Sequence, residues 1–293
     1  MAVETTTFSN NSADTWFRDI MFDCVLCPRA CHVNRLAGQT GYCGQTAELM
    51  AARASLHYWE EPCISGTSGS GTVFFSGCNL RCVFCQNHNI ALGKAGRVIA
   101  PEHLAEIFLQ LQEQGANNIN LVTPTHFLPQ IVIALEQAKQ QGLHLPIVYN
   151  TGSYESPEAL RHLEGLVDIY LPDLKYFSPE LSTAYSHAPD YFETACAAIS
   201  EMYRQVGDSV IDDDTGLMQH GMIVRHLLLP GQTKDSKKIL RYLHETYGDH
   251  IYISIMNQYT PLPQVADIEV LNRTVTPEEY DRVLRFAERI GIE

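Results

Sequence analysis

Beyond residue 70 the chain alternates between short apolar runs and longer stretches whose apolar residues recur at helical spacing. The apolar runs are four to eight residues long, and such runs are typical of buried strands. In one longer stretch Leu104, Phe108 and Leu111 stand three or four positions apart, which places them on one helical face. The apolar runs cover 72–76, 118–122, 146–149, 168–171, 222–229 and 251–255, and the helical stretches cover 101–115, 128–140, 157–163, 179–186, 191–206, 236–246 and 277–290.

This alternation predicts an α/β fold. Strands that are apolar throughout belong in a parallel sheet, because crossover helices cover both of its faces. Six strand–helix units predict a partial (β/α)6 barrel, whose functional groups we expect at the carboxyl ends of the strands. Residues 1–70 do not follow the alternation, so we expect an N-terminal cysteine-rich appendage at 1–70 and the barrel at 71–293. The segment 65–71 is rich in Ser and Gly, which indicates either a flexible connection to the barrel or a tight glycine-dependent loop near the predicted cluster.

The charge balance excludes several kinds of partner. The 293 residues include 34 acidic and 20 basic side chains, and the net charge of −14 argues against a nucleic-acid partner, since clustered Lys and Arg neutralise phosphates. The first twenty residues lack the basic and apolar regions of a signal peptide. No apolar run approaches the roughly 18 residues of a membrane span. We therefore expect a cytoplasmic protein without a membrane partner.

Nine cysteines, seven of them in two groups, indicate metal binding in a reducing compartment rather than a disulfide framework. In one group Cys78, Cys82 and Cys85 have the spacing C-x3-C-x2-C directly after the first apolar run. Three thiolates on one loop can hold three irons of a [4Fe–4S] cluster, which leaves the fourth iron open to bind a small molecule. The alternatives are three buried structural cysteines or a zinc knuckle, although zinc sites usually pair two C-x2-C units and only Cys82 and Cys85 have that spacing.

This loop, with an aromatic residue before its last cysteine, resembles the motif of the radical S-adenosylmethionine (radical SAM) enzymes. The resemblance implies a partial barrel in which Cys78, Cys82 and Cys85 bind a [4Fe–4S] cluster. It implies that the open iron chelates the amino and carboxylate groups of SAM, and that reductive cleavage yields a 5′-deoxyadenosyl radical. It also implies a one-electron donor of the flavodoxin or ferredoxin type.

The second group comprises Cys24, Cys27, Cys31 and Cys43, with the spacing C-x2-C-x3-C-x11-C. Four thiolates within twenty residues suffice for a tetrahedral zinc site or for a second iron–sulfur cluster. A reduced, metal-free thiol patch is the third alternative, because the spacing alone does not select a metal. The role of such a centre is structural or electron-relaying.

Together the N-terminal cysteine motif, the loop Gly77–Asn87 and the stretch Asn120–His126 resemble the pyruvate formate-lyase activating enzyme-like proteins with an N-terminal cysteine motif. The resemblance covers residues 24–260. It implies a radical SAM oxidoreductase that installs a glycyl radical on a protein substrate. Two other functions stay open: a radical SAM enzyme that acts on a small molecule or another peptide, and a non-catalytic iron–sulfur or zinc protein.

Polar residues follow the strands where this superfamily binds SAM. After the second strand many members carry a Gly-Gly-Glu-like motif that receives the SAM ammonium group, and this chain has neither the glycines nor the glutamate there. The hydroxyls of Thr123 and Thr125 can accept the same hydrogen bonds, and His126 either contacts SAM or substrate or simply starts a helix. Asn150 and Thr151, at the end of the third strand, resemble residues that approach the ribose and amino-acid parts of SAM, and an ordinary capped turn is the alternative.

Charged residues follow the next two strands. Asp173 and Lys175 point to the same side and resemble the Asp-x-Lys motif of glycyl-radical activating enzymes, which helps to hold SAM; a surface salt bridge is the alternative. Arg225 begins a stretch similar to the Arg-x4-Pro-Gly of these enzymes, and we expect it to face the barrel interior near SAM. We expect no catalytic acid or base, because hydrogen-atom abstraction depends on placing a C–H bond close to the radical. The expected substrate mouth is lined by Thr125, His126, Tyr154, Arg225 and Gln258.

Overall fold

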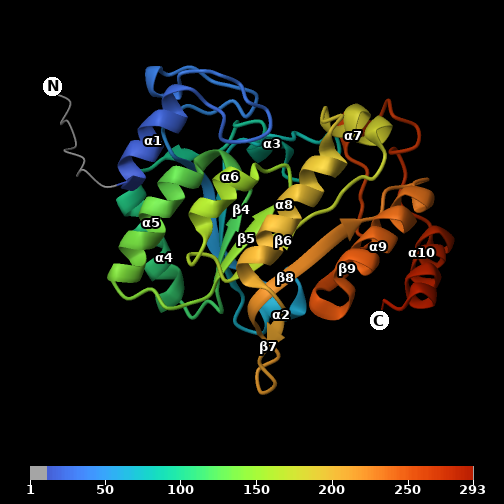
Figure 1. The fold of residues 1–293 in the computed structure, drawn as a ribbon. Helices are drawn as coiled ribbons and strands as arrows, with labels where there is room; N and C mark the ends of the chain where they lie inside the picture. Colours follow the sequence, from blue (N-terminus) through green and yellow to red (C-terminus); the bar gives the residue numbers. More distant parts are fainter. Residues whose placement is uncertain (1–11, 293) are drawn as a thin grey trace, which may run out of the picture.

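The computed structural model of the protein describes residues 12–292. In these residues nine strands form one sheet, and six of them run parallel in their chain order, as expected of consecutive strand–helix units (Figure 1). These six are β2 (Ser70–Phe75), β4 (Ile119–Val122), β5 (Ile147–Thr151), β6 (Ile169–Pro172), β8 (Met218–Leu227) and β9 (Tyr252–Met256). The structure confirms the α/β fold and the partial (β/α)6 barrel.

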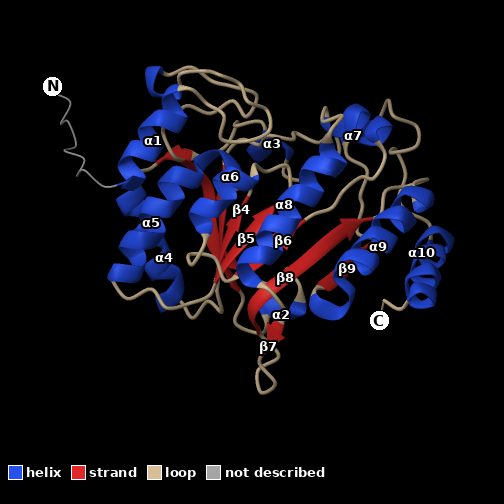
Figure 2. Ribbon diagram, in the orientation of Figure 1, coloured by secondary structure: helices blue, strands red, loops and turns tan. Residues whose placement is uncertain are grey.

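Helices cover the outer face of the sheet (Figure 2). The main ones are α4 (Pro101–Glu113), α5 (Leu128–Gln140), α6 (Pro157–Leu160), α7 (Pro179–Ser186), α8 (Tyr191–Val206), α9 (Thr233–Tyr247) and α10 (Pro277–Ile290). Five of them begin with Pro in the first turn, where its missing N–H has no helical partner to lose. The predicted helix at 157–163 is split into α6 and the 3-10 helix η3 (Arg161–Leu163). Among residues 12–292 no helix has the length and apolarity needed to cross a membrane.

Three further strands are antiparallel and have no counterpart in the predicted pattern. They are β1 (Met50–His57), which pairs with β2, β3 (Arg97–Val98), which pairs with β1, and β7 (Val210–Ile211), which pairs with β8. The sequence of β1, MAARASLH, contains no β-branched residue, so its strand conformation comes from pairing with β2. Part of the predicted appendage therefore belongs to the sheet. Residues 1–11 of that appendage lie outside the described residues, and the domain boundary at residue 70 stays a prediction.

The connection between β1 and β2 is a tight loop. Gly66 and Gly69 have φ values of +50° and +89°, and the N–H of Gly69 donates to the carbonyl oxygen of Ser65 at 2.9 Å. Residues 65–71 therefore form the tight glycine-dependent loop of the second alternative, but not near the predicted cluster site, because the loop precedes β2 and the cysteines follow the opposite end of that strand. The remaining short elements are α1 (Ser12–Phe22), η1 (Arg35–Ala37), α2 (Pro62–Ser65), α3 (His88–Ala91), η2 (Thr125–Phe127), η4 (Gly248–His250) and η5 (Pro263–Val265).

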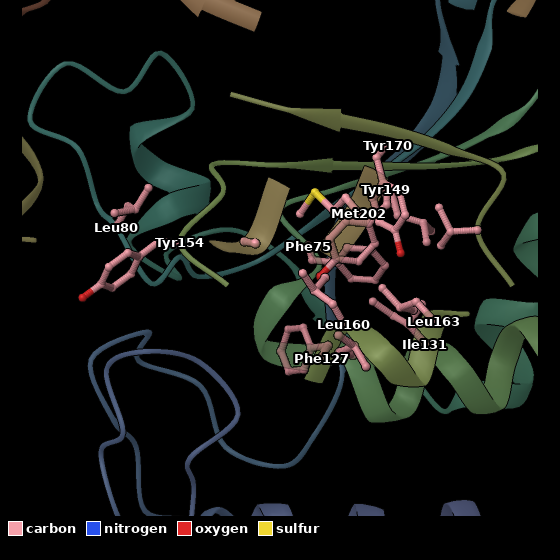
Figure 3. Packing of buried hydrophobic residues seen from close by; sticks show 14 of the residues in the cluster. Phe75, Leu80, Phe127, Ile131, Tyr149, Tyr154, Leu160, Leu163, Tyr170 and Met202 are labelled. Carbon is pink, nitrogen blue, oxygen red and sulfur yellow. The ribbon is translucent and has the colours of Figure 1, made fainter. Parts of the chain in front are cut away.

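The largest part of the core lies between the sheet and the outer helices. Tyr149 and Tyr170 pack there edge to face, with ring centroids 5.8 Å apart (Figure 3). Val148, one position earlier on β5, points to the barrel interior and joins a second cluster with Ile64 of α2 and Ile223 of β8. Both faces of β2, β4, β5 and β6 are therefore buried, which explains why the sequences of these strands are mostly apolar.

Candidate active site

The three cysteines of the predicted cluster site, Cys78, Cys82 and Cys85, lie on one loop after β2, residues 77–87, called the cluster loop below. Burial, reinforced by the neighbouring thiols, raises the pKa of Cys78 and raises that of Cys85 to about 12. Such thiols release their protons when they bind metal, because the thiolate is the ligand. The N–H of Leu80 donates to Sγ of Cys78 at 3.3 Å. Three thiols on one loop, with a backbone donor directed at one of them, fit a [4Fe–4S] cluster.

Two glycines allow other segments to approach the cluster loop. A Cβ on Gly77 would lie 2.8 Å from the carbonyl oxygen of Cys43, and a Cβ on Gly152, after β5, would lie 2.8 Å from the side chain of Leu80. The same Cβ on Gly152 would stand 3.4 Å from Cε of Lys175. A larger residue at position 152 would therefore push the cluster loop away from the strand ends.

Asp173, Lys175 and Arg225 form the centre of an ion network at the ends of β6 and β8. Nζ of Lys175 lies 2.6 Å from one carboxylate oxygen of Asp173, and Nε of Arg225 lies 2.8 Å from the other. The three side chains are 12–19 % exposed, so the pair is not a surface salt bridge. Burial alone would raise the pKa of Asp173, but Arg225 and Lys175 outweigh it and lower this pKa below its ordinary value. The Asp173 carboxylate therefore stays ionised.

The ion network also includes Glu60, Glu61 and Asn150. Nη1 of Arg225 lies 3.0 Å from Oε2 of Glu60 and 3.9 Å from Oε2 of Glu61, and Nη2 donates to Oδ1 of Asn150 at 2.7 Å. Burial raises the pKa of Glu60, and Arg225 opposes this effect. Glu60 and Glu61 were not predicted from the sequence, because they precede the barrel, match no motif and stand about 165 positions before their partner.

Thr125 and Thr151 contact a different carboxylate, that of Glu155. The hydroxyl of Thr125 donates to Oε1 of Glu155 at 2.6 Å, and the hydroxyl of Thr151 donates to the same oxygen. Glu155 is fully buried, and burial raises its pKa to about 7 against the opposing effect of the hydrogen bonds, which include one from Tyr149. Since neighbouring strand residues point to opposite faces, Asn150 joins the ion network whereas Thr151 joins Glu155. No motif in the sequence identifies Glu155.

His126 is buried beside the start of the cluster loop. Its Nε2 lies 2.6 Å from the carbonyl oxygen of Ser76, and its Nδ1 has no hydrogen-bond partner among the described residues. Burial, followed by the charge of Arg35, lowers the pKa of His126 to about 3, so the ring is neutral. The structure thus divides the predicted SAM residues: Asn150, Asp173, Lys175 and Arg225 belong to the ion network, and Thr123, Thr125, His126 and Thr151 do not.

The N-terminal cysteine segment, residues 24–43, packs against the cluster loop. Nε of Arg29 donates to the carbonyl oxygen of Asn79 at 2.8 Å, and the hydroxyl of Tyr42 donates to the carbonyl oxygen of Leu80 at 3.3 Å. The guanidinium carbon of Arg29 lies 3.9 Å from the ring centroid of Tyr42. Among residues 12–292, no three His, Cys, Asp or Glu side chains are close enough together to hold a single metal ion. Neither the N-terminal cysteine segment nor the cluster loop is an exception. The segment forms one wall of the predicted cluster site.

The residues predicted to line a substrate mouth do not meet at one opening. Thr125, His126 and Tyr154 are only 2–3 % exposed, and the hydroxyl of Tyr154 donates to Asp190 at 2.7 Å. Gln258 is exposed, and its carbonyl oxygen accepts a hydrogen bond from the cluster loop. The three buried residues therefore do not line an opening in this structure, although they lie in the segments that follow β4 and β5.

Known proteins match this chain in sequence over different lengths. The model of the radical SAM superfamily matches residues 72–243. An uncharacterized protein of Methanocaldococcus jannaschii is 27 % identical over 286 residues, which cover 94 % of this chain and 77 % of that protein. A pyruvate formate-lyase-activating enzyme of Clostridium pasteurianum is 29 % identical over 121 residues, which cover 39 % of this chain and 48 % of that enzyme.

Among solved structures, the chain is similar to native anSMEcpe with bound AdoMet and Cp18Cys peptide, and to native anSMEcpe with bound AdoMet. The TM-score is 0.46 and the identity 13 % in both cases, with 72 % of this chain covered. The matches cover 55 % and 56 % of those chains, so this chain spans about half the length of the solved structures that it matches. Because the superfamily model matches more than half of the sequence, and the matched region contains the cluster loop, four complete parallel strands and most of β2, the chain belongs to the radical SAM superfamily.

Proposed function

We propose that this radical SAM enzyme cleaves SAM reductively and uses the resulting radical to take a hydrogen atom from a glycine of a protein substrate. The observation that carries the proposal is the buried ion network, which lies at the strand ends next to the cluster loop. The partial similarity to a pyruvate formate-lyase-activating enzyme supports the choice of a glycine as the target. Because fold alone does not determine substrate, this choice needs the direct test described below.

A [4Fe–4S] cluster held by Cys78, Cys82 and Cys85 would supply the electron that splits SAM into methionine and a 5′-deoxyadenosyl radical. A one-electron donor of the flavodoxin or ferredoxin type would deliver that electron. That radical would take a hydrogen atom from the substrate, which would yield 5′-deoxyadenosine and leave the unpaired electron on the glycine. The residues of the chain bind and orient the reactants, because the transfer requires C5′ to lie close to the C–H bond.

The charges of the ion network complement those of SAM. The network contains three carboxylates, from Glu60, Glu61 and Asp173, and two cations, from Lys175 and Arg225, so it has one negative charge in excess when all are ionised. SAM has a sulfonium and an ammonium group against one carboxylate, and therefore one positive charge in excess. Lys175 can bind the SAM carboxylate, and the protein carboxylates can bind the SAM cations.

We also propose that the four cysteines of the N-terminal cysteine segment bind a second metal centre, either zinc or an iron–sulfur cluster. Cys24 and Cys43 are buried, and Arg35 is 1 % exposed. Nη1 of Arg35 has no hydrogen-bond partner among the described residues. A centre with four thiolate ligands is anionic and would give this buried cation a partner.

The glycyl-radical proposal is tested by anaerobic incubation of the reconstituted enzyme with SAM, a reductant and a candidate glycyl-radical enzyme. Electron paramagnetic resonance should show a glycyl doublet together with release of 5′-deoxyadenosine. The variant with Cys78→Ala, Cys82→Ala and Cys85→Ala should give neither signal. If no candidate gives the doublet while a low-molecular-weight extract stimulates 5′-deoxyadenosine release, the enzyme acts on a small molecule and the glycine assignment is wrong.

A further inference from the structure

The last residue of α7, Ser186, contacts a cysteine of the cluster loop. Its hydroxyl donates to Sγ of Cys82 at 2.9 Å, and the two residues are 104 positions apart in the chain. Ser186 is fully buried and Cys82 is 8 % exposed, so water does not compete for this hydrogen bond. The contact is tertiary, and it occurs only because α7 ends beside the cluster loop.

A buried tyrosine hydrogen-bonds to the same serine hydroxyl. The hydroxyl of Tyr176 lies 2.7 Å from Oγ of Ser186, and Tyr176 is fully buried. A serine hydroxyl has one hydrogen, so when Ser186 donates to the sulfur, Tyr176 must donate to Ser186. The three groups then form a chain from Tyr176 through Ser186 to Cys82, in which each hydrogen bond polarises the next.

The backbone around Ser186 is held from two sides. Nη2 of Arg29, in the N-terminal cysteine segment, donates to the carbonyl oxygen of Ser186 at 3.0 Å. The N–H of Val83, in the cluster loop, donates to the carbonyl oxygen of Tyr185 at 2.9 Å. The end of α7 is thus tied to the cluster loop and to its neighbouring wall, which keeps the Ser186 hydroxyl within reach of the sulfur.

We propose that Ser186 tunes the reduction potential of the [4Fe–4S] cluster by donating a hydrogen bond to the Cys82 ligand. Reduction adds negative charge to the cluster and its thiolates, and a hydrogen bond to a ligand sulfur stabilises the reduced state more than the oxidised state. Ser186 therefore makes the cluster easier to reduce by its electron donor. The inference rests on the proposed role of Cys82 as a cluster ligand, and it does not depend on which substrate the radical attacks.

The test is an anaerobic redox titration of the reconstituted enzyme, followed by electron paramagnetic resonance of the reduced cluster. At the potential where the wild-type cluster is half reduced, Ser186→Ala should lower the ratio of reduced to oxidised cluster about tenfold, which is about 59 mV for one electron. Ser186→Thr retains the hydroxyl and should restore the wild-type ratio. Tyr176→Phe should shift the ratio in the same direction by a smaller factor, because it removes only the donor to Ser186.

Ser182→Ala is the matched control, because Ser182 is buried on the same helix and its hydroxyl donates to the carbonyl oxygen of Pro179. This variant should leave the ratio unchanged, and an equal shift in it would show a packing effect and overturn the proposal. A Ser186→Ala enzyme that holds its full iron content and titrates like the wild type would also overturn it. If Ser186→Ala loses the cluster, Tyr176→Phe provides the test. A lower ratio of reduced to oxidised cluster in this variant supports the proposal, and an unchanged or higher ratio overturns it. The redox titrations require no protein substrate. They can therefore confirm the role of Ser186 even if the enzyme forms no glycyl radical.

Discussion

The guanidinium of Arg225 lies 2.8 Å from the carboxylate of Asp173, and the same two residues form an isolated β-bridge. Regular pairing between β6 and β8 ends at Tyr170. Pro172 has no N–H to donate, which interrupts the ladder before the strands meet again at Asp173 and Arg225. The ion pair therefore joins the two strands at the edge of the barrel where the cluster loop lies.

Removal of the Arg225 cation should destabilise the protein strongly. Arg225→Met leaves the Asp173 and Glu60 carboxylates buried without their main partner, and breaking such a buried pair typically costs about 3–5 kcal/mol. We expect a clear fall in the unfolding temperature of the purified protein, measured by anaerobic calorimetry. In the Arg225→Met background, Glu60→Gln should recover part of the loss, because it removes one uncompensated charge.

Arg204→Met is the matched control for this prediction. Arg204 also binds two carboxylates, those of Glu164 and Glu201, but its side chain is 50 % exposed and solvent screens its charge. Its removal should change the unfolding temperature far less than removal of Arg225. Equal effects of the two substitutions would show that burial of the Arg225 network has no special energetic role.

The second prediction concerns SAM affinity. Asp173→Asn and Lys175→Met should each weaken SAM binding about tenfold, because each removes a charged contact worth roughly 1.5–3 kcal/mol that the substitution replaces only in part. Isothermal titration calorimetry of the reconstituted enzyme measures this affinity. Lys139→Met, a substitution on the outer helix α5, should leave it unchanged. Unchanged affinity in both network variants would mean that the ion network serves structure alone.

The barrel and part of the site could be predicted from the sequence because local patterns encode them. Continuous apolar runs identified the six parallel strands, and the residues that follow each strand meet at one edge of the sheet. Asp173 and Lys175 stand two positions apart, so strand geometry alone places both on one side. The direction of Thr125 could not be predicted in the same way, since it lies in the 3-10 helix η2 after a residue with positive φ, Thr123.

The residues that were missed depend on contacts between distant segments. Glu60 lies between β1 and α2 and meets Arg225 of β8 only in the folded barrel, and nothing near Glu60 in the sequence indicates a site. Ser186 likewise gains its role from Cys82, which is far away in the chain. The segment that became β1 is rich in alanine, a good helix former, so only its pairing with β2 makes it a strand. Local secondary-structure propensity does not predict contacts between segments that are far apart in the sequence.

The third prediction concerns the N-terminal cysteine segment. The variant that lacks Cys78, Cys82 and Cys85 should still contain one metal centre, seen as about one zinc or about four irons per chain. Further replacement of Cys24 and Cys43 by Ala should remove that centre. Elemental analysis after anaerobic purification gives both numbers. A triple variant that contains neither metal would leave the four N-terminal thiols as a reduced, unliganded patch.

The fourth prediction is a pH dependence of stability that comes from His226. Its Nδ1 lies 2.8 Å from the carbonyl oxygen of Leu174, and its Nε2 lies 2.8 Å from the hydroxyl of Ser236. Burial lowers the pKa of His226 from 6.5 to about 4. The unfolded chain therefore binds a proton at this residue below about pH 6.5, whereas the folded protein does so only below about pH 4.

Stability should therefore be fully retained above pH 6.5 and should fall as the pH decreases from 6.5 to about 4, by up to about 1.4 kcal/mol per pH unit for this residue. His226→Gln keeps a side chain that can hydrogen-bond but cannot titrate, so its unfolding temperature should depend less steeply on pH in this window. The slope of stability against pH should fall by the amount that corresponds to one proton. It should not fall to zero, because His126, whose pKa burial lowers to about 3, still titrates in the variant. Parallel pH profiles for the wild type and His226→Gln would show that His226 is protonated equally in the folded and unfolded states, contrary to its buried, neutral environment.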